Sequence, residues 1–254
     1  MRLDDYDAIL CDLDGCLISG TRVLPGAQAL IARAGARLII LSNNSTDTPA
    51  SLSQRLAAMG LEAPAERIVL AGTAALDHLA QEGEVRLCLY GSAALTAHAR
   101  EMGLTLDREA PSHVLLTRDE DFAYGDLKAC IGFLRGGARL LVANPDESHP
   151  GPQGEPVPET GSLLAAILSV LPGLDYTVIG KPEAGLYRHA MARLPAGARR
   201  LLAIGDNPAT DGAGAERLGL DHVLIGPLSA RFPDLAALLA EPAVEYQEVN
   251  GAAI

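Results

Sequence analysis

The sequence predicts an α/β protein built around a mainly parallel sheet. Short apolar runs alternate along the chain with longer Ala- and Leu-rich stretches, which is the order of strands and helices in such folds. Apolar residues make up 48% of the 254 residues, so the chain can bury a core of useful size. This composition excludes a disordered chain, a collagen-like repeat and a small disulfide scaffold.

The short apolar runs are predicted to be strands because turn-forming or polar residues bound each of them. They are Ala8–Cys11, Arg37–Leu41, Arg67–Leu70, Val85–Tyr90, Val114–Leu116, Arg139–Val142, Tyr176–Ile179, Arg200–Ile204 and His222–Ile225. The stretches between them are predicted to be helices, and several begin with a proline, which the first helical turn tolerates. They are Pro25–Arg33, Pro49–Met59, Thr73–Gln81, Ala93–Met102, Tyr124–Leu134, Ser162–Leu171, Glu183–Arg193, Thr210–Leu218 and Pro233–Leu239.

Residues 144–161 interrupt this alternation, because they are rich in proline, glycine and acidic residues. Such a composition predicts a long irregular loop, and long loops in compact domains are usually functional or disordered. No sharp change in composition marks a domain boundary elsewhere in the chain. The division into domains therefore has to come from the motifs.

Charge and cysteine content narrow the class of partner. The chain has 32 acidic and 20 basic residues and a net charge of −12, so we expect neither nucleic acid nor an anionic membrane as a partner. The four cysteines are scattered without a CxxC pattern, which favours free buried thiols in a reducing compartment. Acidic residues stand where a signal peptide needs an apolar run, and no apolar stretch is long enough to span a bilayer. A cytoplasmic protein is the expectation.

Polar side chains follow four of the predicted strands at the point where each strand ends. They are Asp12 and Asp14 after the first strand, Ser42 and Asn43 after the second, Lys181 after Tyr176–Ile179, and Asp206 with Asp211 after Arg200–Ile204. Each has an ordinary explanation when taken alone, as a solvated loop acid, a helix cap or a surface lysine. Ligands of open parallel sheets bind at the carboxyl ends of the strands, so these groups can meet in one crevice. Acids gathered there would repel one another unless a divalent cation binds, and the lysine and hydroxyl suit a phosphoryl group.

The ordered motifs DxDG, SNN, GKP and GDxxxxD resemble those of the haloacid dehalogenase (HAD) superfamily of phosphatases. The longer resemblance is to subfamily IIA, the group with p-nitrophenyl phosphatase, pyridoxal phosphatase and UMP-type nucleotide phosphatases. Residues 117–130, 143–146 and 159–167 resemble the cap and cap-return sequences of that subfamily. The resemblance implies a Rossmann-like, doubly wound core over residues 1–72 and 175–254. It also implies an inserted α/β cap domain, of the second cap type and its subtype A, over residues 73–174.

The resemblance also implies a phosphomonoester hydrolase that works through an aspartyl-phosphate. Asp12 would attack phosphorus, and Asp14 would protonate the leaving oxygen and later deprotonate the attacking water. Ser42, Asn43 and Lys181 would hold the phosphoryl oxygens.

Mg²⁺ is the implied cofactor. Its ligands would come from Asp12, from Asp14 through the backbone carbonyl and from Asp206. Asp211 would be an outer ligand or an acid behind the ligands. Cys16 is a departure from the family, which mostly has Val or Thr at this position.

Substrate choice is expected to lie in the cap. His149 matches a position where pyridoxal phosphatases carry a histidine that contacts substrate, and Asn144 is a second candidate, although each has an ordinary explanation in a loop. The cap return reads PETG where PGTG is common, which puts Glu159 in place of a glycine. The chain has no Trp and three Phe, so stacking on a large base is not indicated. The substrate class stays open among sugar phosphates, nucleoside monophosphates, pyridoxal phosphate and glycerol phosphate.

Other interpretations use the same residues. A HAD-fold protein that binds phosphate without catalysis would be favoured by loss of a motif residue, and none is lost. A phosphotransferase on the same core would pass the phosphoryl group to an alcohol instead of water. A signalling receiver is usually about half this length and lacks the second aspartate, and no nucleotide-binding glycine motif is present. A homodimer is possible, since this subfamily often forms one.

Overall fold

The computed structural model describes residues 3–150 and 155–241. Contacts within the chain divide it into two compact units, which we describe separately. Within the described residues, the first unit comprises the chain up to Ser42, Pro49–Val69 and the chain from Lys181 onward. The second unit comprises Asn43–Thr48 and Leu70–Gly180.

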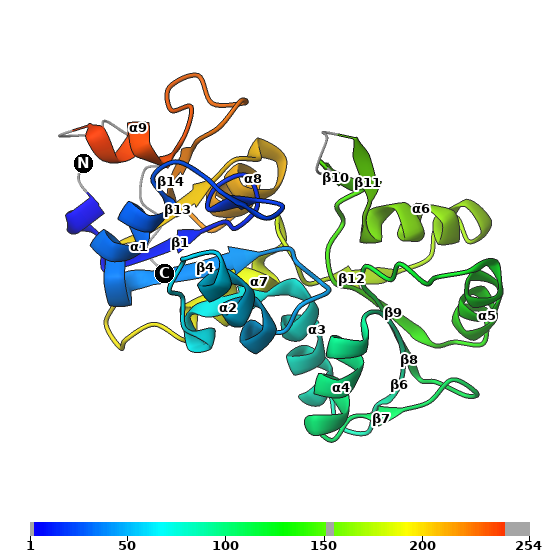
Figure 1. Cartoon of the computed structure of the whole chain (residues 1–254). Coiled ribbons are helices and arrows are strands. Elements are labelled where there is room, and N and C mark those ends of the chain that lie inside the picture. The colour runs from blue at the N-terminus through cyan, green and yellow to red at the C-terminus, as the bar shows by residue number, and fades with distance from the viewer. Residues whose placement is uncertain (1–2, 151–154, 242–254) are drawn as a thin grey trace. The chain divides into compact units, whose positions relative to one another are not determined.

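A five-stranded sheet forms the centre of the first unit, in the order β14-β13-β1-β4-β5 (Figure 1). The strands are β1 (Ala8–Cys11), β4 (Leu38–Ser42), β5 (Ile68–Leu70), β13 (Leu201–Gly205) and β14 (Asp221–Leu224). β1 pairs in parallel with β13 on one side and with β4 on the other. Every residue of β1, β4 and β13 is buried, as expected for parallel strands that are covered on both faces.

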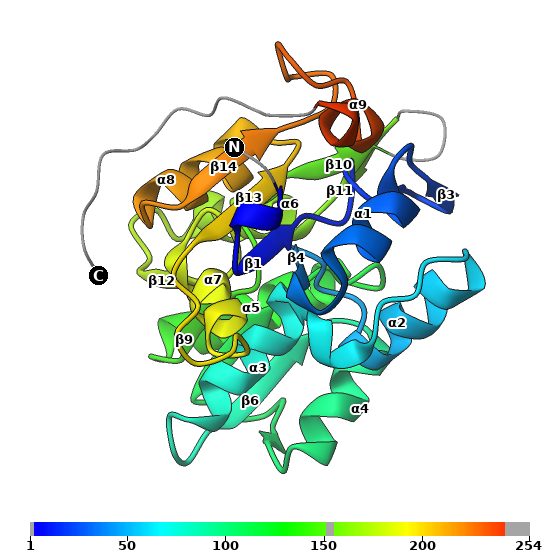
Figure 2. The ribbon, with the colours of Figure 1, turned by 90° about the vertical axis from the view of Figure 1, so that its left-hand side faces the viewer.

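Helices lie along both sides of this sheet (Figure 2). They are α1 (Ala27–Ala34), α2 (Pro49–Ala58), α7 (Ala184–Met191), α8 (Ala213–Arg217) and α9 (Leu235–Ala240). A π-helical turn, Pro208–Gly212, leads into α8. The unit also has a short hairpin, β2 (Ile18–Ser19) with β3 (Arg22–Val23), and three 3₁₀ turns at Leu3–Asp5, Gly35–Arg37 and Ala65–Arg67.

The second unit has a five-stranded sheet of its own, in the order β12-β9-β8-β6-β7. The strands are β6 (Arg86–Tyr90), β7 (Thr105–Leu106), β8 (His113–Leu116), β9 (Arg139–Val142) and β12 (Tyr176–Val178). The helices are α3 (Ala71–Ala80), α4 (Ala93–Glu101), α5 (Tyr124–Arg135) and α6 (Thr160–Val170). Apolar residues of β6, β8, β9, α5 and α6 pack into one core between this sheet and the last two helices.

Every predicted strand and helix appears, with ends that differ by a few residues. Two expectations were wrong. The strand Tyr176–Val178 pairs with β9 in the second sheet and not in the first, so the second unit extends to Gly180. Residues 144–161 are not irregular throughout, because β10 (Ser148–Pro150) pairs with β11 (Pro156–Pro158) in an antiparallel hairpin and α6 begins at Thr160. Residues 151–154 of that predicted loop lie outside the described residues.

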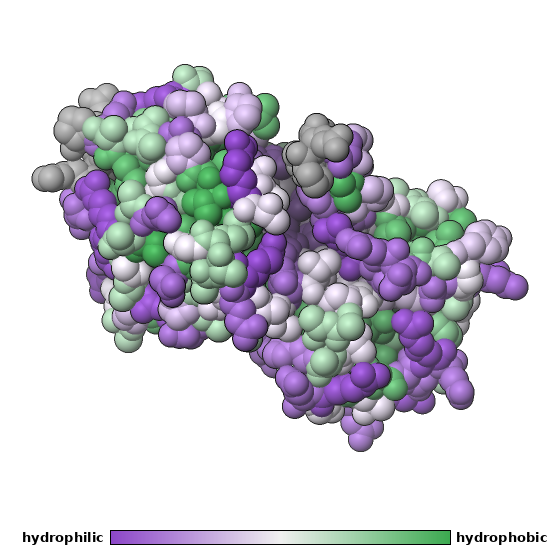
Figure 3. All heavy atoms as spheres, viewed as in Figure 1, coloured by the Kyte–Doolittle hydropathy of each residue, from purple (hydrophilic) through white to green (hydrophobic). Residues whose placement is uncertain are grey.

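Four large apolar side chains are well exposed: Tyr124, Val170, Tyr176 and Leu228. Hydrophilic and hydrophobic residues are interspersed over the face drawn in Figure 3. No helix within residues 3–150 and 155–241 has both the length and the apolar character needed to cross a membrane. The four cysteines are free and buried, as their scattered positions predicted.

Candidate active site

The carboxyl ends of three adjacent strands place the predicted core residues in the first unit. β1 lies between β13 and β4, so the residues that follow these strands meet at one edge of the sheet. Asp12 comes directly after β1, Ser42 is the last residue of β4, and Asp206 follows β13. The parallel register thus brings together groups that are far apart in the sequence.

Lys181 connects two of the acids. Its Nζ donates to Asp12 Oδ1 at 2.7 Å and to Asp211 Oδ1 at 2.6 Å. The lysine is only 2% exposed, and burial alone would lower the pKa of its ammonium group. The two carboxylates outweigh burial and raise the pKa of Lys181 well above its ordinary value, so the side chain is a cation. The sequence prediction that Lys181 lies beside Asp12 agrees with this geometry.

Asp211 is held on several sides. Besides the bond from Lys181, its Oδ2 accepts from the backbone N–H of Asn207 at 3.2 Å, and its backbone carbonyl accepts from the Tyr187 hydroxyl at 3.1 Å. Both Asp211 and Tyr187 are buried. The carboxylate therefore orients the lysine, and this geometry fits the role of an acid behind the metal ligands better than that of a ligand.

Asp12 and Asp206 lie in an acidic environment. Burial raises the pKa of Asp12 well above its ordinary value, Lys181 opposes the shift, and the neighbouring acids Asp211 and Asp206 add to it. Burial, followed by the negative charge of Asp211, raises the pKa of Asp206 to about 6. Among the described residues, no Lys, Arg or His side chain lies within 4.0 Å of the Asp206 carboxylate. One ammonium group thus serves three carboxylates.

These donors fit a divalent cation. The potential ligand atoms of Asp12, Asp206 and Cys16 all lie within 4.8 Å of one another. Gly15 makes room for this arrangement, because a Cβ on Gly15 would overlap the Asp206 carboxylate. Carboxylate oxygens are the ligands that Mg²⁺ and Ca²⁺ prefer. The side chain of Asp14 is not part of this group of atoms and belongs to an exposed residue, which leaves it accessible for proton transfer.

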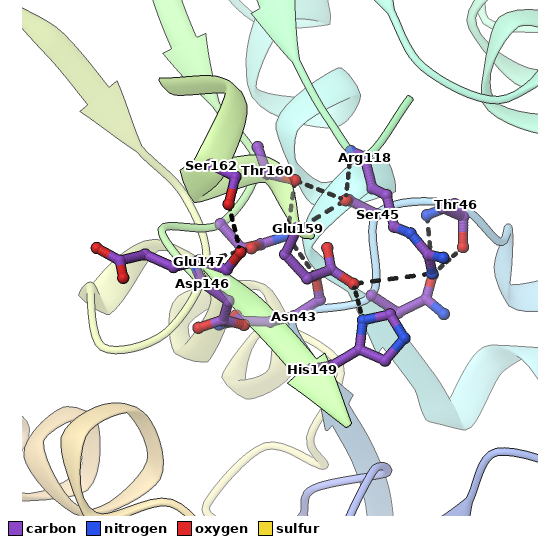
Figure 4. A network of polar contacts seen from close by, with 12 residues as sticks. Asn43, Ser45, Thr46, Arg118, Asp146, Glu147, His149, Glu159, Thr160 and Ser162 are labelled. Atoms are coloured by element: carbon purple, nitrogen blue, oxygen red, sulfur yellow. Dashed lines mark hydrogen bonds and ion pairs between the residues drawn. The ribbon is translucent and has the colours of Figure 1, made fainter. Parts of the chain in front are cut away.

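A network of polar contacts in the second unit contains the remaining predicted residues (Figure 4). Asn144 Nδ2 donates to the Asn43 carbonyl at 2.8 Å, to Ser45 Oγ at 3.2 Å and to Thr160 Oγ1 at 3.3 Å. Asn43 in turn donates from Nδ2 to Asp146 Oδ2 at 3.0 Å. Asn144 is 1% exposed and its amide is used by these partners. We therefore assign Asn144 to holding the segment Asn43–Thr48 in place, which corrects the expectation that it contacts substrate.

His149 lies on β10 and faces an ion-pair partner that the motif search did not single out as a site residue. Its Nδ1 is 2.8 Å from Glu159 Oε1, and Arg118 Nη1 is 3.8 Å from the same oxygen (Figure 4). Burial raises the pKa of Glu159, and the positive charges of Arg118 and His149 oppose that shift. The PETG departure is the sequence signal that could have marked Glu159, whereas no pattern marked Arg118 or Tyr187.

Comparison with known proteins agrees with this geometry. A family model described as haloacid dehalogenase-like hydrolase matches residues 9–105, and a HAD-hydrolase-like model matches residues 178–241. A dihydroxyacetone phosphatase of Corynebacterium glutamicum is 33% identical over 220 residues, which cover 85% of this chain and 79% of the relative.

Two solved structures share the fold over most of the chain. A 4-nitrophenylphosphatase from Thermotoga maritima superposes with a TM-score of 0.85 at 25% identity, covering 93% of this chain and 97% of that one. A glycerol phosphate phosphatase from Mycobacterium tuberculosis, solved in complex with magnesium, gives a TM-score of 0.80 at 28% identity, covering 88% and 68%. The chain therefore belongs to the haloacid dehalogenase-like hydrolases, and within them to the subfamily IIA phosphatases of small phosphomonoesters.

Proposed function

We propose that this phosphatase hydrolyses a short, hydroxyl-rich phosphomonoester with Mg²⁺, and that Asp12 is its nucleophile. The observation that carries the proposal is the buried Lys181 ammonium group, 2.7 Å from Asp12 and 2.6 Å from Asp211. A lysine fixed between two acids in this way is available to hold a phosphoryl oxygen beside the nucleophile.

Asp12 is suited to attack only while its carboxylate is ionised. Burial among acids works against ionisation, and the positive charge of Lys181 favours it. Attack of an Asp12 oxygen on phosphorus forms a P–O bond as the bond to the leaving oxygen breaks. Water then attacks the aspartyl-phosphate and regenerates the carboxylate. Splitting the displacement into two steps makes each barrier lower than that of direct hydrolysis.

Asp14 is proposed as the group that handles protons. Its side chain is exposed and lies two residues from the nucleophile, and its negative charge contributes to the raised pKa of Asp206. It would donate a proton to the leaving oxygen and then accept one from the attacking water. Ser42 and the backbone N–H of Asn43 would hold the other phosphoryl oxygens.

The metal proposal rests on the donor atoms of Asp12 and Asp206 and on the lack of a nearby cation for Asp206 among the described residues. These two carboxylates, with the backbone carbonyl of Asp14, would hold Mg²⁺. When bound, the ion supplies positive charge that offsets the carboxylates and the phosphoryl oxygens. The magnesium complex of the related glycerol phosphate phosphatase supports this assignment.

The substrate class follows from the relatives and from the second unit. Two of the relatives are named for dihydroxyacetone phosphate and glycerol phosphate, both three-carbon compounds with free oxygens. We propose that the second unit serves as the cap and that His149, Arg118 and Glu159 select such a leaving group. Charged hydrogen-bonding side chains suit hydroxyl groups, whereas a nucleobase or pyridoxal ring would call for aromatic stacking.

The test is phosphate release from a panel of phosphomonoesters with Mg²⁺ and with EDTA. The panel contains dihydroxyacetone phosphate, glycerol phosphate, hexose phosphates, nucleoside monophosphates, pyridoxal phosphate and p-nitrophenyl phosphate. We expect Mg²⁺-dependent turnover with the highest kcat/KM for a three-carbon substrate, and none with folded Asp12→Asn protein. Preference for a nucleotide or pyridoxal phosphate would overturn the substrate class. Phosphoryl transfer to added glycerol in place of water would favour the phosphotransferase alternative.

A further inference from the structure

Cys16 contributes a sulfur atom to the acidic cluster of the first unit. Its Sγ lies within 4.8 Å of a carboxylate oxygen of Asp12 and of Asp206. The residue is 1% exposed and follows Gly15, where the chain turns back beneath the Asp206 carboxylate. The proposed phosphatase mechanism uses both carboxylates and gives this thiol no role.

Sulfur changes which ions such a cluster can bind. Mg²⁺ prefers an octahedron of oxygen ligands, so the thiol adds nothing for that ion. Zn²⁺ and Cd²⁺ accept thiolate and carboxylate together, and Zn²⁺ takes four ligands in a small tetrahedral shell. One sulfur and two carboxylate oxygens already provide three donors, and a water molecule can provide the fourth.

We propose that Asp12, Cys16 and Asp206 form a thiophilic metal site, which binds Zn²⁺ or Cd²⁺ through the Cys16 sulfur and excludes Mg²⁺. Binding replaces the S–H proton by a sulfur–metal bond and releases that proton to solvent, with no change of oxidation state. Because the two carboxylates are shared with the proposed Mg²⁺ site, only one kind of ion can be held at a time. This site goes beyond the proposed function, and it does not require turnover.

Cys11 is the other thiol that a test must separate. It lies next to Cys16, and its Sγ donates to the backbone carbonyl of Asp12 at 3.2 Å. Its position on β1 leaves it outside the group of ligand atoms formed by Asp12, Cys16 and Asp206. The proposal therefore predicts different results for the two neighbouring cysteines.

The experiment is a Cd²⁺ titration of the full chain, freed of metal with EDTA and then dialysed, without substrate. Cadmium bound to thiolate absorbs in the ultraviolet, so the readout is a charge-transfer band. The matched variants are Cys16→Ser, Cys11→Ala and Cys130→Ala, where Cys130 lies in the core of the second unit. Circular dichroism melts show whether each variant folds, and Cys16→Val serves as a second variant if Cys16→Ser does not.

We expect a band in the wild type that saturates at one Cd²⁺ per chain and moves to higher Cd²⁺ concentration when Mg²⁺ is added. Cys11→Ala and Cys130→Ala should keep the band, and Cys16→Ser should lose it. The affinity loss should exceed the roughly 10- to 100-fold that removal of an outer partner costs a metal site. A band retained by Cys16→Ser, a wild type without a band, or a titration insensitive to Mg²⁺ would each overturn the proposal. A protein without phosphatase activity but with the Cys16-dependent band would overturn only the proposed function.

Discussion

Gly15 and Asp206 approach each other so closely that a Cβ on Gly15 would overlap the Asp206 carboxylate. Gly15 also has a φ of 81°, which side-chain-bearing residues rarely adopt. The loop after β1 can therefore turn beneath Asp206 only because residue 15 has no side chain. The DxDG motif thus sets the position of a carboxylate on a different strand, almost 200 residues away in the sequence.

Gly15→Ala should damage the metal site more than the fold. The added methyl group would displace the Asp206 carboxylate, so we expect Mg²⁺ affinity to fall by about tenfold or more, a loss of at least ~1.4 kcal/mol of binding free energy. Gly20→Ala is the matched control, because Gly20 also has positive φ (59°) but nothing lies within 4 Å of its added Cβ. Both variants should lose about 1 kcal/mol of unfolding free energy for the strained backbone. Calorimetric Mg²⁺ titration is the measurement, and equal affinities for the two variants would contradict the expectation.

Lys181→Met should destabilise the fold strongly. It leaves Asp12 and Asp211 buried without their shared cation, and removal of one partner of a buried ion pair costs about 3–5 kcal/mol. Adding Asp211→Asn removes one of the two stranded charges and should restore part of the loss. Urea unfolding of the single and double variants measures both effects. A loss below about 1 kcal/mol for Lys181→Met would mean that water solvates the two carboxylates.

The stability of the metal-free protein should fall as pH rises from about 4 to about 6. Burial and Asp211 raise the pKa of Asp206 from 3.8 to about 6, so the folded state keeps a proton that the unfolded state has already lost. Folded protein is therefore favoured below this window, and the advantage disappears as pH rises through it. Asp206 should account for at most about 3 kcal/mol of the change, and Asp12 acts in the same direction.

Asp206→Asn isolates that contribution. The variant should show a flatter dependence of unfolding free energy on pH, measured by urea titration in EDTA at several pH values. Mg²⁺ should restore stability to the wild type at pH 7 and should restore less to the variant. A wild-type profile that rises with pH across this window would show that the Asp206 carboxylate is better solvated than its surroundings indicate.

The first sheet was predictable from sequence because its strands are buried on both faces. β1 and β4 read as continuous apolar runs, and polar residues mark their carboxyl ends. The β10–β11 hairpin was missed because three prolines occupy its paired positions, and proline normally argues against a strand. The assignment of β12 to the wrong sheet has a different cause. A three-residue strand carries no signal that says which sheet it joins.

The same distinction holds at the site. Strand ends predicted that Asp12, Lys181 and Asp206 come together, because parallel pairing brings those ends to one edge. Sequence spacing could not tell that Asp211 turns toward Lys181, or that Tyr187 holds the Asp211 carbonyl from α7. Those contacts depend on helix packing, and side-chain direction at a packed interface is not encoded in a local motif.

Asp14→Asn should affect alkyl phosphates more than aryl phosphates. An alkoxide leaving group needs a proton and a nitrophenolate does not, so the loss for glycerol phosphate should be about 10²–10⁴-fold. The loss for p-nitrophenyl phosphate should be much smaller, because only the second step would still use Asp14. Steady-state kcat/KM with both substrates, in saturating Mg²⁺, is the measurement. Equal losses on both would exclude Asp14 as the acid.

His149→Ala should change substrate selection and leave the reaction itself intact. His149 Nδ1 lies 2.8 Å from Glu159 Oε1, so the variant removes one of two positive partners of that buried carboxyl group. If this cluster binds the hydroxyl groups of the leaving group, KM for glycerol phosphate should rise about 10- to 100-fold, as expected for a lost charged hydrogen bond. KM for p-nitrophenyl phosphate, which has no such hydroxyls, should change little.

His98→Ala is the matched control for His149→Ala. His98 lies on α4 of the same unit, and its Nδ1 is 3.9 Å from the exposed Glu101, so its loss should alter neither KM value. Glu159→Gln should reproduce the His149→Ala pattern, because it removes the charge that His149 and Arg118 share. A parallel rise in KM for both substrates in His149→Ala would point to general damage to the second unit. Unchanged KM values in both variants would return His149 and Glu159 to a structural role in the hairpin.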